Sequence, residues 1–406
     1  MSFQTGLSGL NAASRNLDVI GNNIANANTI GAKVSRAEFS EIVAASTIAA
    51  NGRTEGIGVE VATVSQQFTQ GGVNVTGGNL DLAINGGGFF RVTMPDNTAA
   101  YTRAGEFKLD PQGNIVTNAG ANLMGYPTTI TGVATSSTLQ PLKLPTGTPI
   151  PANATTSITA QFNLGATAPI WNVPLPPTPL TTYGTSLVTY DSQGAPVTAS
   201  FYMRKSANDT WEVFSDPTSA ATATATTIAT LTFGVNGQLL GSVPASPTLP
   251  LTSPNPSIGT FSPTIDMTGA TQYATAFSVA DLKQDGFGPG DFVALKIGEN
   301  GVISARYSNG EIQAAGQVAL ADFRNVQGLR PSAAGSWSET AASGQPVLGA
   351  PSQGKFGALR SGALEESNID LTSELVNMMT AQRTYQANAQ TIKTQDQVLS
   401  TLTNLR

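Results

Sequence analysis

The chain has 406 residues, of which 11% are charged and 40% are hydrophobic, and its formal net charge is −6. This length allows about two or three domains with cores of their own, and the negative charge argues against nucleic acid and anionic membrane surfaces as partners. The chain contains no Cys and no His, which excludes disulfides, thiol nucleophiles, imidazole bases and the usual zinc sites.

The N-terminal stretch "MSFQTGLSGLNAAS" lacks the marks of a secretory signal. It has no basic region, and Gly6, Ser8 and Asn11 interrupt any apolar core. No apolar run elsewhere is long enough to span a bilayer. We expect a chain that stays in the cytosol or is exported without a cleaved signal peptide, and that does not insert into membranes.

Residues 1 to about 30 have the periodicity of an amphipathic helix. Apolar side chains recur every seven residues at Phe3, Leu10, Leu17 and Ile24, flanked by Leu7, Ala13 and Ile20. The pattern then gives way to "LDVIGNNIANANTIGAK" (17–33), which is rich in amides at Asn22, Asn23, Asn26 and Asn28. Amide side chains compete with the backbone for hydrogen bonds, and Gly31 has a permissive backbone. We therefore predict that the helix ends here and the chain turns outward.

The run from Gly71 to about Lys143 is typical of β-strands. "LDLAI" alternates apolar residues, Asn85-Gly86 follows as a turn, "FRVTM" alternates again, and "DPQG" (110–113) is a second turn. The glycine-rich "NGGGFF" (85–90) is not followed by the Lys-Ser/Thr of a phosphate-binding loop. We interpret it as a tight turn.

Residues from about 144 to 283 differ in composition. No charged residue lies between Lys143 and Asp191 or between Asp216 and Asp266, which is compatible with disorder. However, "SLVTYDSQGAPVTASFYM" and "DTWEVF" indicate strands around a "DSQG" turn, and these favour a β-domain with long loops. "GDFVALKIGENGVISARY" predicts another hairpin, with its turn at Asn300-Gly301. The acidic loop "DLKQDGFGPGD" lacks the ligand spacing of an EF-hand, so a simple turn is favoured over a calcium site.

The last element is a long helix from about Asp370, which caps it, with Glu374 in its first turn. Apolar side chains again recur every seven residues at Leu371, Met378, Tyr385, Ile392 and Leu399, flanked by Leu375, Ala389 and Leu402. At about 1.5 Å per residue this helix reaches ~54 Å, longer than a small domain is wide. Packing on the protein's own core is one reading of both terminal helices. Their exposed positions carry Gln, Asn, Thr and Ser instead of Lys and Glu, which favours an assembly seam among like helices.

Both termini resemble those of the bacterial flagellar rod and hook proteins. The N-terminal signature is "LDVIGNNIANANTIGAK" and the C-terminal one is "ESNIDLTSELVNMMTAQRTYQANAQTIKTQDQVLSTLTNLR". "LDLAINGGGFFRV", "YTRAGEFKLDPQGNIVTNAG" and "LMGYP" are also similar to that family. Rod members are generally shorter, so the extra zone at 144–283 favours a hook-type member over a distal rod protein.

The resemblance implies an α+β multidomain fold, with long terminal helices forming a coiled-coil-like inner domain and two mainly β domains, the outer inserted into the inner. The implied parts are a terminal helical domain (1–30 with 365–406), a linker (31–72 with 354–364), an inner β-domain (73–143 with 284–353) and an outer β-domain (144–283). Such a subunit forms a bendable hollow tube that transmits torque from rod to filament and conducts exported subunits.

The implied partners are further copies of the chain, the rod, hook-cap and hook–filament junction proteins, and the flagellar type III export apparatus. The implied location is the hook at the cell surface. "EFSEIV", with Phe39 and Val43, resembles a short recognition motif of export substrates, although helix core explains it equally well. We expect no cofactor, metal or small-molecule substrate. A secreted β-rich adhesin is an alternative from another class, and an enzyme is disfavoured because paired carboxylates and cofactor motifs are missing.

Overall fold

The computed structural model describes residues 2–43, 56–145, 147, 149–171, 183–216 and 227–404. The chain forms two compact units. Unit 1 comprises Met1–Gly147, Ala294–Arg306 and Ile312–Arg406, and unit 2 comprises Thr148–Val293 and Tyr307–Glu311. Unit 2 is thus inserted into the sequence of unit 1, and the units change near residues 147 and 294.

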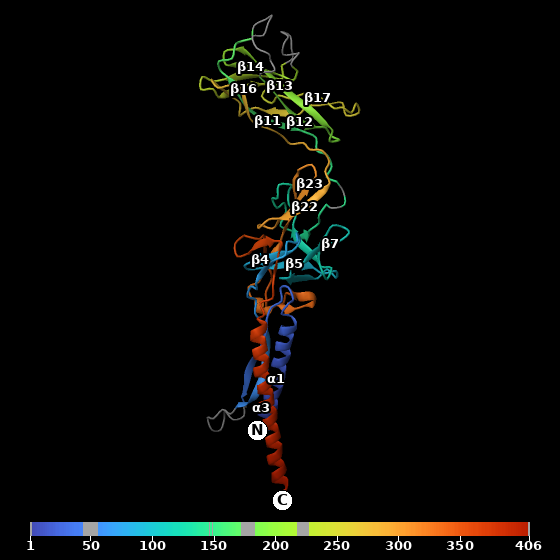
Figure 1. Cartoon of the computed structure of the whole chain (residues 1–406), viewed down its shortest axis with the longest axis vertical. Helices are drawn as coiled ribbons and strands as arrows, with labels where there is room; N and C mark the ends of the chain where they lie inside the picture. Colours follow the sequence, from blue (N-terminus) through green and yellow to red (C-terminus); the bar gives the residue numbers. More distant parts are fainter. Residues whose placement is uncertain are drawn as a thin grey trace. The chain divides into compact units, whose positions relative to one another are not determined.

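Unit 1 contains the two α-helices of the described chain, α1 (Ser2–Ala25) and α3 (Leu371–Asn404), which lie side by side (Figure 1). The cap expected at Asp370 is confirmed, because its Oδ1 accepts the backbone N–H of Thr372 at 2.9 Å. Neither described helix is long and apolar enough to cross a membrane. The helices run antiparallel, since Gly6 faces Ile392, Gly9 faces Asn388 and Asn23 bonds Glu374.

A β-hairpin follows the first helix, formed by β1 (Ser35–Val43) and β2 (Gly56–Gln66). It lies against α1, where the backbone N–H of Val59 donates to Ser8 Oγ. The helical alternative for "EFSEIV" is therefore wrong. Alternate residues of β1 turn toward the helices, and Ala37 is buried there.

The rest of unit 1 is a β-structure around one 13-stranded sheet of described residues. Its main path runs through β22 (Phe292–Ile297), β23 (Val302–Tyr307), β24 (Ile312–Val318), β9 (Asn122–Tyr126), β5 (Phe89–Thr93), β6 (Ala99–Thr102), β27 (Ser336–Ser338) and β26 (Arg330–Pro331). Its side branches are β7 (Phe107–Leu109), β8 (Ile115–Thr117), β10 (Gln140–Pro141), β25 (Leu320–Asp322) and β28 (Val347–Gly349). Short 3₁₀ turns lie at η3 (Val326–Gly328) and η4 (Ala333–Gly335).

The turns expected at "DPQG" and Asn300-Gly301 close the hairpins β7–β8 and β22–β23, which confirms both. The strands on either side of Asn85-Gly86 do not pair with each other. Instead β4 (Leu82–Asn85) pairs with β29 (Ala358–Ser361), and β3 (Val73–Val75) pairs with β30 (Ala363–Glu365). The C-terminal segment therefore returns to the start of the β-structure before it enters α3.

The described residues of unit 2 form two sheets and a short strand pair. One sheet comprises β11 (Ser157–Gly165), β19 (Thr264–Asp266), β20 (Thr271–Tyr273) and β21 (Ser278–Gln284). The other comprises β12 (Gly184–Tyr190), β13 (Pro196–Ala207), β14 (Thr210–Phe214), β15 (Ala229–Phe233) and β16 (Leu239–Val243), and β17 (Leu251–Thr252) pairs with β18 (Thr260–Phe261). Trp211, Phe162 and Phe201 share its core. The strands around "DSQG" confirm the ordered β-domain over disorder.

Candidate functional site

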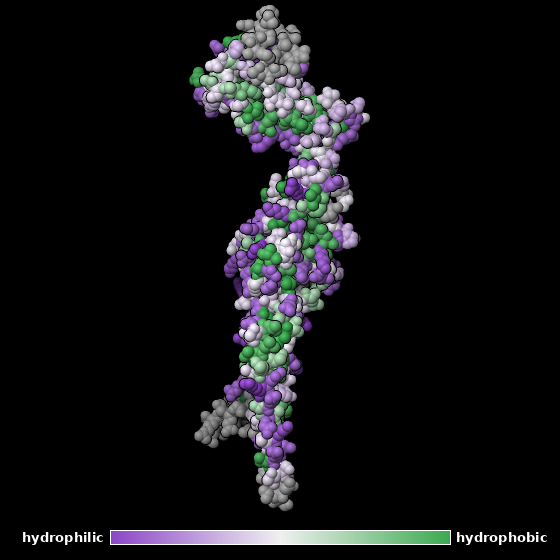
Figure 2. Space-filling view, viewed as in Figure 1, coloured by the Kyte–Doolittle hydropathy of each residue, from purple (hydrophilic) through white to green (hydrophobic). Residues whose placement is uncertain are grey.

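The predicted seam residues lie along the helix pair, and many remain in contact with solvent. On α3, Leu375 is 47% and Tyr385 is 37% exposed, and Leu7 on α1 is 44% exposed. Leu371 and Leu399 are also exposed, while Leu10, Leu17, Ile24, Met378 and Ile392 are half-buried. Phe3 and Leu402 fall within the helices, but their side chains lie outside the described residues. Hydrophobic side chains gather on the helix pair near the β-strands of unit 1 (Figure 2).

Small residues make much of the contact between α1 and α3, where the seam residue Ile392 also lies against Gly6. Ala13 and Ala381 are buried between the helices. A Cβ at Gly9 would lie 3.0 Å from Asn388 Nδ2, so the backbones approach closely there. Several large apolar side chains, among them Leu371, Leu375 and Tyr385, lie instead on the exposed flanks of the pair.

A groove runs between the helices and the hairpin. It has a volume of about 390 Å³. Its lining comprises Gly9, Ala12, Ala13 and Asn16 of α1, Phe39 and Val59 of the hairpin, and Thr380, Ala381, Thr384 and Asn388 of α3. Phe39, predicted as an export determinant, forms part of this wall, while the Val43 side chain lies outside the described residues.

The asparagine-rich segment spans the end of α1, with Asn22 and Asn23 in its last turn and Asn26 and Asn28 beyond it. The Asn26 backbone and side chain both donate to the carbonyl of Asn22, at 3.1 and 2.9 Å. Asn28 is exposed. Gly31 has φ +71°, and a Cβ there would lie 2.6 Å from the amide nitrogen of Ala104. Only glycine fits this turn, which brings the chain against the β-structure.

Asn23 connects three segments. Its Nδ2 donates to the Ser35 carbonyl at 2.8 Å and to Glu374 Oε2 at 3.2 Å, while its Oδ1 accepts the Ser35 N–H at 2.9 Å. It is 2% exposed. It therefore fastens the end of α1 to the first strand and to the first turn of α3.

A buried charge cluster, which sequence reasoning missed, lies just beyond. Lys33 Nζ is 2.6 Å from Glu365 Oε1, and Arg103 Nη1 is 3.0 Å from Glu365 Oε2. Lys33 also donates to the carbonyl of Thr69 at 2.7 Å, and Arg103 donates to that of Gly86 at 3.0 Å. Burial lowers the pKa of Lys33 from its ordinary value, the nearby Glu365 raises it without full compensation, and Arg103 lowers it further.

Asn368 completes this arrangement. Its Oδ1 accepts the N–H of Val34 at 2.8 Å and its Nδ2 donates to the Gln67 carbonyl at 2.8 Å. We call Asn23, Lys33, Arg103, Glu365 and Asn368 the joint, because together they connect the helix pair to the β-structure of unit 1. The only sequence signal was that Asn23, Lys33 and Asn368 lie within the two terminal signatures, and Glu365 directly precedes the C-terminal one.

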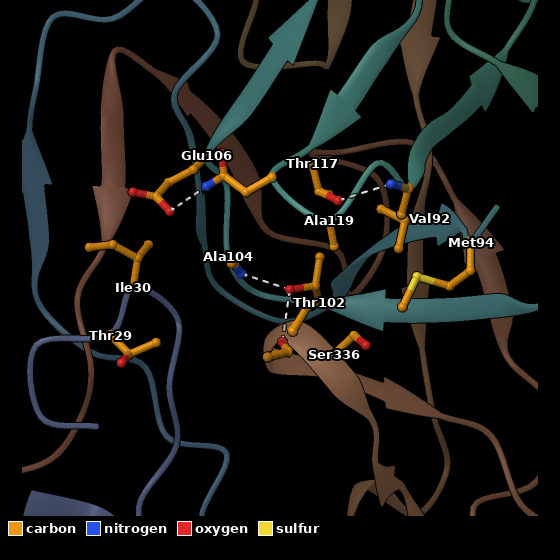
Figure 3. Close-up of a pocket in the computed structure, with 14 residues that line it drawn as sticks. Thr29, Ile30, Val92, Met94, Thr102, Ala104, Glu106, Thr117, Ala119 and Ser336 are labelled. Atoms are coloured by element: carbon orange, nitrogen blue, oxygen red, sulfur yellow. Dashed lines mark hydrogen bonds between the residues drawn. The ribbon is translucent and has the colours of Figure 1, made fainter. Parts of the chain in front are cut away.

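A small pocket of about 130 Å³ lies beside the joint. Thr29 and Ile30, from the asparagine-rich segment, line one side of the pocket, and Met94 and Ser336 line the side formed by the β-structure (Figure 3). Thr102 Oγ1 donates to the Gly335 carbonyl and accepts the Ala104 N–H, both at 3.0 Å. Among the described residues no cluster of acidic side chains has the arrangement of a metal site. The pocket lies between the asparagine-rich segment and the β-structure.

Four protein family models match the chain. "Flagella basal body rod protein" matches residues 3–33 and "Flagellar basal body rod FlgEFG protein C-terminal" matches residues 360–405. "Flagellar hook protein FlgE/F/G D1 domain" matches residues 83–161, and "Flagellar basal body protein FlaE D2 domain" matches residues 158–287. The terminal models thus cover α1, the asparagine-rich segment and α3.

Full-length relatives decide the family. The chain is 40% identical to the flagellar hook protein FlgE of Escherichia coli over 414 residues, covering 100% of both chains. It is 41% identical to that of Salmonella typhimurium over 419 residues, again covering 100% of both. The chain belongs to the flagellar hook protein family.

A solved structure agrees with this fold. The crystal structure of Helicobacter pylori flagellar hook protein FlgE2 matches with a TM-score of 0.53 and 17% identity, covering 72% of this chain and 100% of that one. At this identity the match speaks for the fold alone. The residues matched by the D2 family model (158–287) lie within unit 2. The joint residues lie in unit 1, outside the matched range.

Proposed function

We propose that the chain is a structural subunit of the bacterial flagellar hook and is not an enzyme. It polymerises into a bendable hollow tube that transmits torque from rod to filament and conducts exported subunits. The observation that carries this proposal is the apolar, charge-poor surface of the helix pair. Leu371, Leu375 and Tyr385 are exposed on α3. Soluble monomers rarely expose contiguous apolar patches, which usually mark an interaction surface.

The charge content of the helices supports burial of this surface among copies. Between Leu371 and Gln382 the only ionisable side chain is Glu374, which is buried against Asn23. The other polar side chains of α3 are mostly amides and hydroxyls, and Gln382, Gln386 and Gln390 are exposed. Uncharged groups are less costly to bury than charges. They would also give the bore a neutral surface to which passing chains do not adhere.

Membership of the hook protein family supports a wider assembly. We propose the rod, hook-cap and hook–filament junction proteins as partners and the flagellar type III apparatus as the export route. That apparatus would recognise Phe39 and Val43 in the unfolded chain. The location is the hook at the cell surface. The domain parts expected from sequence remain our proposal, with the joint connecting the helical part to the inner β-domain. An inserted unit 2 favours a hook subunit over a distal rod subunit.

Electron microscopy of the purified, polymerised protein tests this function. We expect hollow tubes with the curvature of a hook. Straight, stiff rods would favour the distal rod alternative, and a protein that stays monomeric at all concentrations would overturn the proposal.

A further inference from the structure

The helix pair has two different apolar surfaces. The groove contains Gly9 and Asn16 of α1, and the next residues along the chain are the seam residues Leu10 and Leu17. One residue corresponds to a rotation of about 100° around a helix. Ser8, one residue before Gly9, accepts the N–H of Val59 in the hairpin. Leu10 and Leu17, one residue after Gly9 and Asn16, therefore lie on the flank of α1 that is turned away from the hairpin.

The same relationship holds on α3. Thr384 lines the groove, and Tyr385, the next residue, belongs to the opposite flank together with Leu371 and Leu375. We call these six residues the seam face: Leu10, Leu17, Ile24, Leu371, Leu375 and Tyr385. The groove is concave with a floor of small side chains, while the seam face presents large ones.

The two surfaces also match in charge. Among the described residues no ionisable side chain lines the groove, and none of the six residues of the seam face is ionisable. A charged partner would lose solvation in the groove without gaining an ion pair. An apolar helical surface with large side chains has no charge to desolvate, and the seam face of the chain itself is such a surface.

We propose that the seam face of one copy packs into the groove of a second copy. This inference rests on the proposed polymer, and it names the faces that meet. Because the two faces differ, the contact is heterologous and leaves one groove and one seam face open after each addition. Such a contact propagates into a helical tube, whereas a contact between two seam faces would stop at a dimer.

Cross-linking tests the pairing, since the chain contains no Cys. Thr384→Cys places a thiol in the groove and Leu375→Cys places one on the seam face. Within one chain these positions are about 13 Å apart along α3, so a bismaleimide shorter than that cannot join them internally. Tubes of the double variant should give a ladder of covalent multimers, and tubes of either single variant should remain monomeric on denaturing gels.

The outcomes separate the two proposals. Tubes of the double variant that give no ladder would overturn the pairing and leave the hook function intact. Dimers from Leu375→Cys alone would also overturn it, because they require seam faces to meet. If the unmodified chain forms no tubes, both proposals fail.

A second variant tests the groove without a cross-linker. Ala12 lines the groove and is 9% exposed, so Ala12→Leu fills the space that the second copy would occupy. We expect the concentration needed for polymerisation to rise about tenfold or more, as for an overpacked contact. Asn11→Leu is the matched control, because Asn11 is exposed and lies outside the groove. Equal polymerisation of both variants would exclude the groove as a contact.

Discussion

Lys33 and Glu365 are 332 residues apart in the sequence, yet Lys33 Nζ lies 2.6 Å from Glu365 Oε1 in the interior of unit 1. Arg103 shares the same carboxylate. The Glu365 carboxylate therefore forms ion pairs with two buried cations, Lys33 from the segment after α1 and Arg103 from the β-structure. Glu365 also lies just ahead of α3, so this contact sets how both helices leave the β-structure.

We predict that Glu365→Gln weakens the joint strongly. The substitution leaves Lys33 and Arg103 buried without their anion, which typically costs about 3–5 kcal/mol. Hydrogen exchange should accelerate in peptides covering residues 23–35 and 365–374, while unit 2 should be unaffected. Glu366→Gln is the control, because Glu366 is exposed, and a change of less than about 0.5 kcal/mol is expected there. Equal exchange in the two variants would contradict the proposed role of the cluster.

The close approach of the helices predicts opposite effects at two glycines of α1. A Cβ at Gly21 would meet nothing within 4 Å, so Gly21→Ala should stabilise the helix by up to about 1 kcal/mol. Gly9→Leu should destabilise the pair by about 1–3 kcal/mol, because the side chain collides with Asn388. Circular dichroism during thermal unfolding measures both. Stabilisation by Gly9→Leu would show that the helices are not closely packed there.

Elements with local signals were predictable from the sequence. The cap at Asp370 and the turns at "DPQG" and "DSQG" depend on residues within four positions of one another. The pairing of β4 with β29 and the joint have no such signal, because their partners are brought together only by the complete fold. The hairpin strand β1 was missed because Phe39 and Val43, four residues apart, fit a helix as well as a strand. The small-residue contact of the helices was hidden by the more conspicuous seven-residue pattern of large side chains.

We predict that Leu17→Asp abolishes polymerisation while the β-structures remain folded. Leu17 is half-buried on the seam face, so a charge there would be desolvated when a second copy packs against it, at a cost of several kcal/mol. Sedimentation should show monomers, and near-ultraviolet circular dichroism should remain native. Asn11→Asp is the control, since it adds the same charge at an exposed position. Normal tubes from Leu17→Asp would exclude Leu17 from the contacts between copies.

Unit 2 should lose stability in acid. The hydrogen bond from Ser253 Oγ, at 2.6 Å, holds the pKa of Asp191 below its usual value, with help from the N–H groups of Ala195 and Gln193. Burial raises the pKa of Asp285, but hydrogen bonds from Thr156 and Ser157 outweigh it and leave the pKa lowered. The unfolded chain then binds more protons between the folded pKa values and the unfolded value of about 3.9, so the stabilisation is present above that pH and declines below it.

Trp211 is buried in the core of unit 2, and its fluorescence measures this transition in a Trp171→Phe, Trp337→Phe background, since the chain has three Trp residues. We expect the urea midpoint to fall as the pH decreases from about 4. Asp191→Asn should lower the midpoint at neutral pH and reduce its dependence on pH. A midpoint that is constant down to pH 2 in the unmodified chain would rule out this contribution.

We predict that unit 2 determines the curvature of the tube and is not needed to hold it together. In a bent, rotating tube, the spacing between subunits changes most at the largest radius, where an outer domain lies. Contacts there must slide among similar arrangements, and strong ion pairs would favour a single spacing. Unit 2 suits this role because no charged residue lies between Lys143 and Asp191 or between Asp216 and Asp266.

The structure defines where to remove this unit. A deletion from residue 144 would lose Leu144, which is buried in the core of unit 1. The Ile150 N–H donates to the Gly290 carbonyl at 2.8 Å, so the two chain segments are adjacent there. Replacing residues 151–289 by a short Gly/Ser linker therefore spares unit 1. We expect tubes that still form but are straighter, because outer contacts that select curved forms are gone, and electron microscopy measures this directly. Loss of assembly, or unchanged curvature and stiffness, would assign unit 2 a different role.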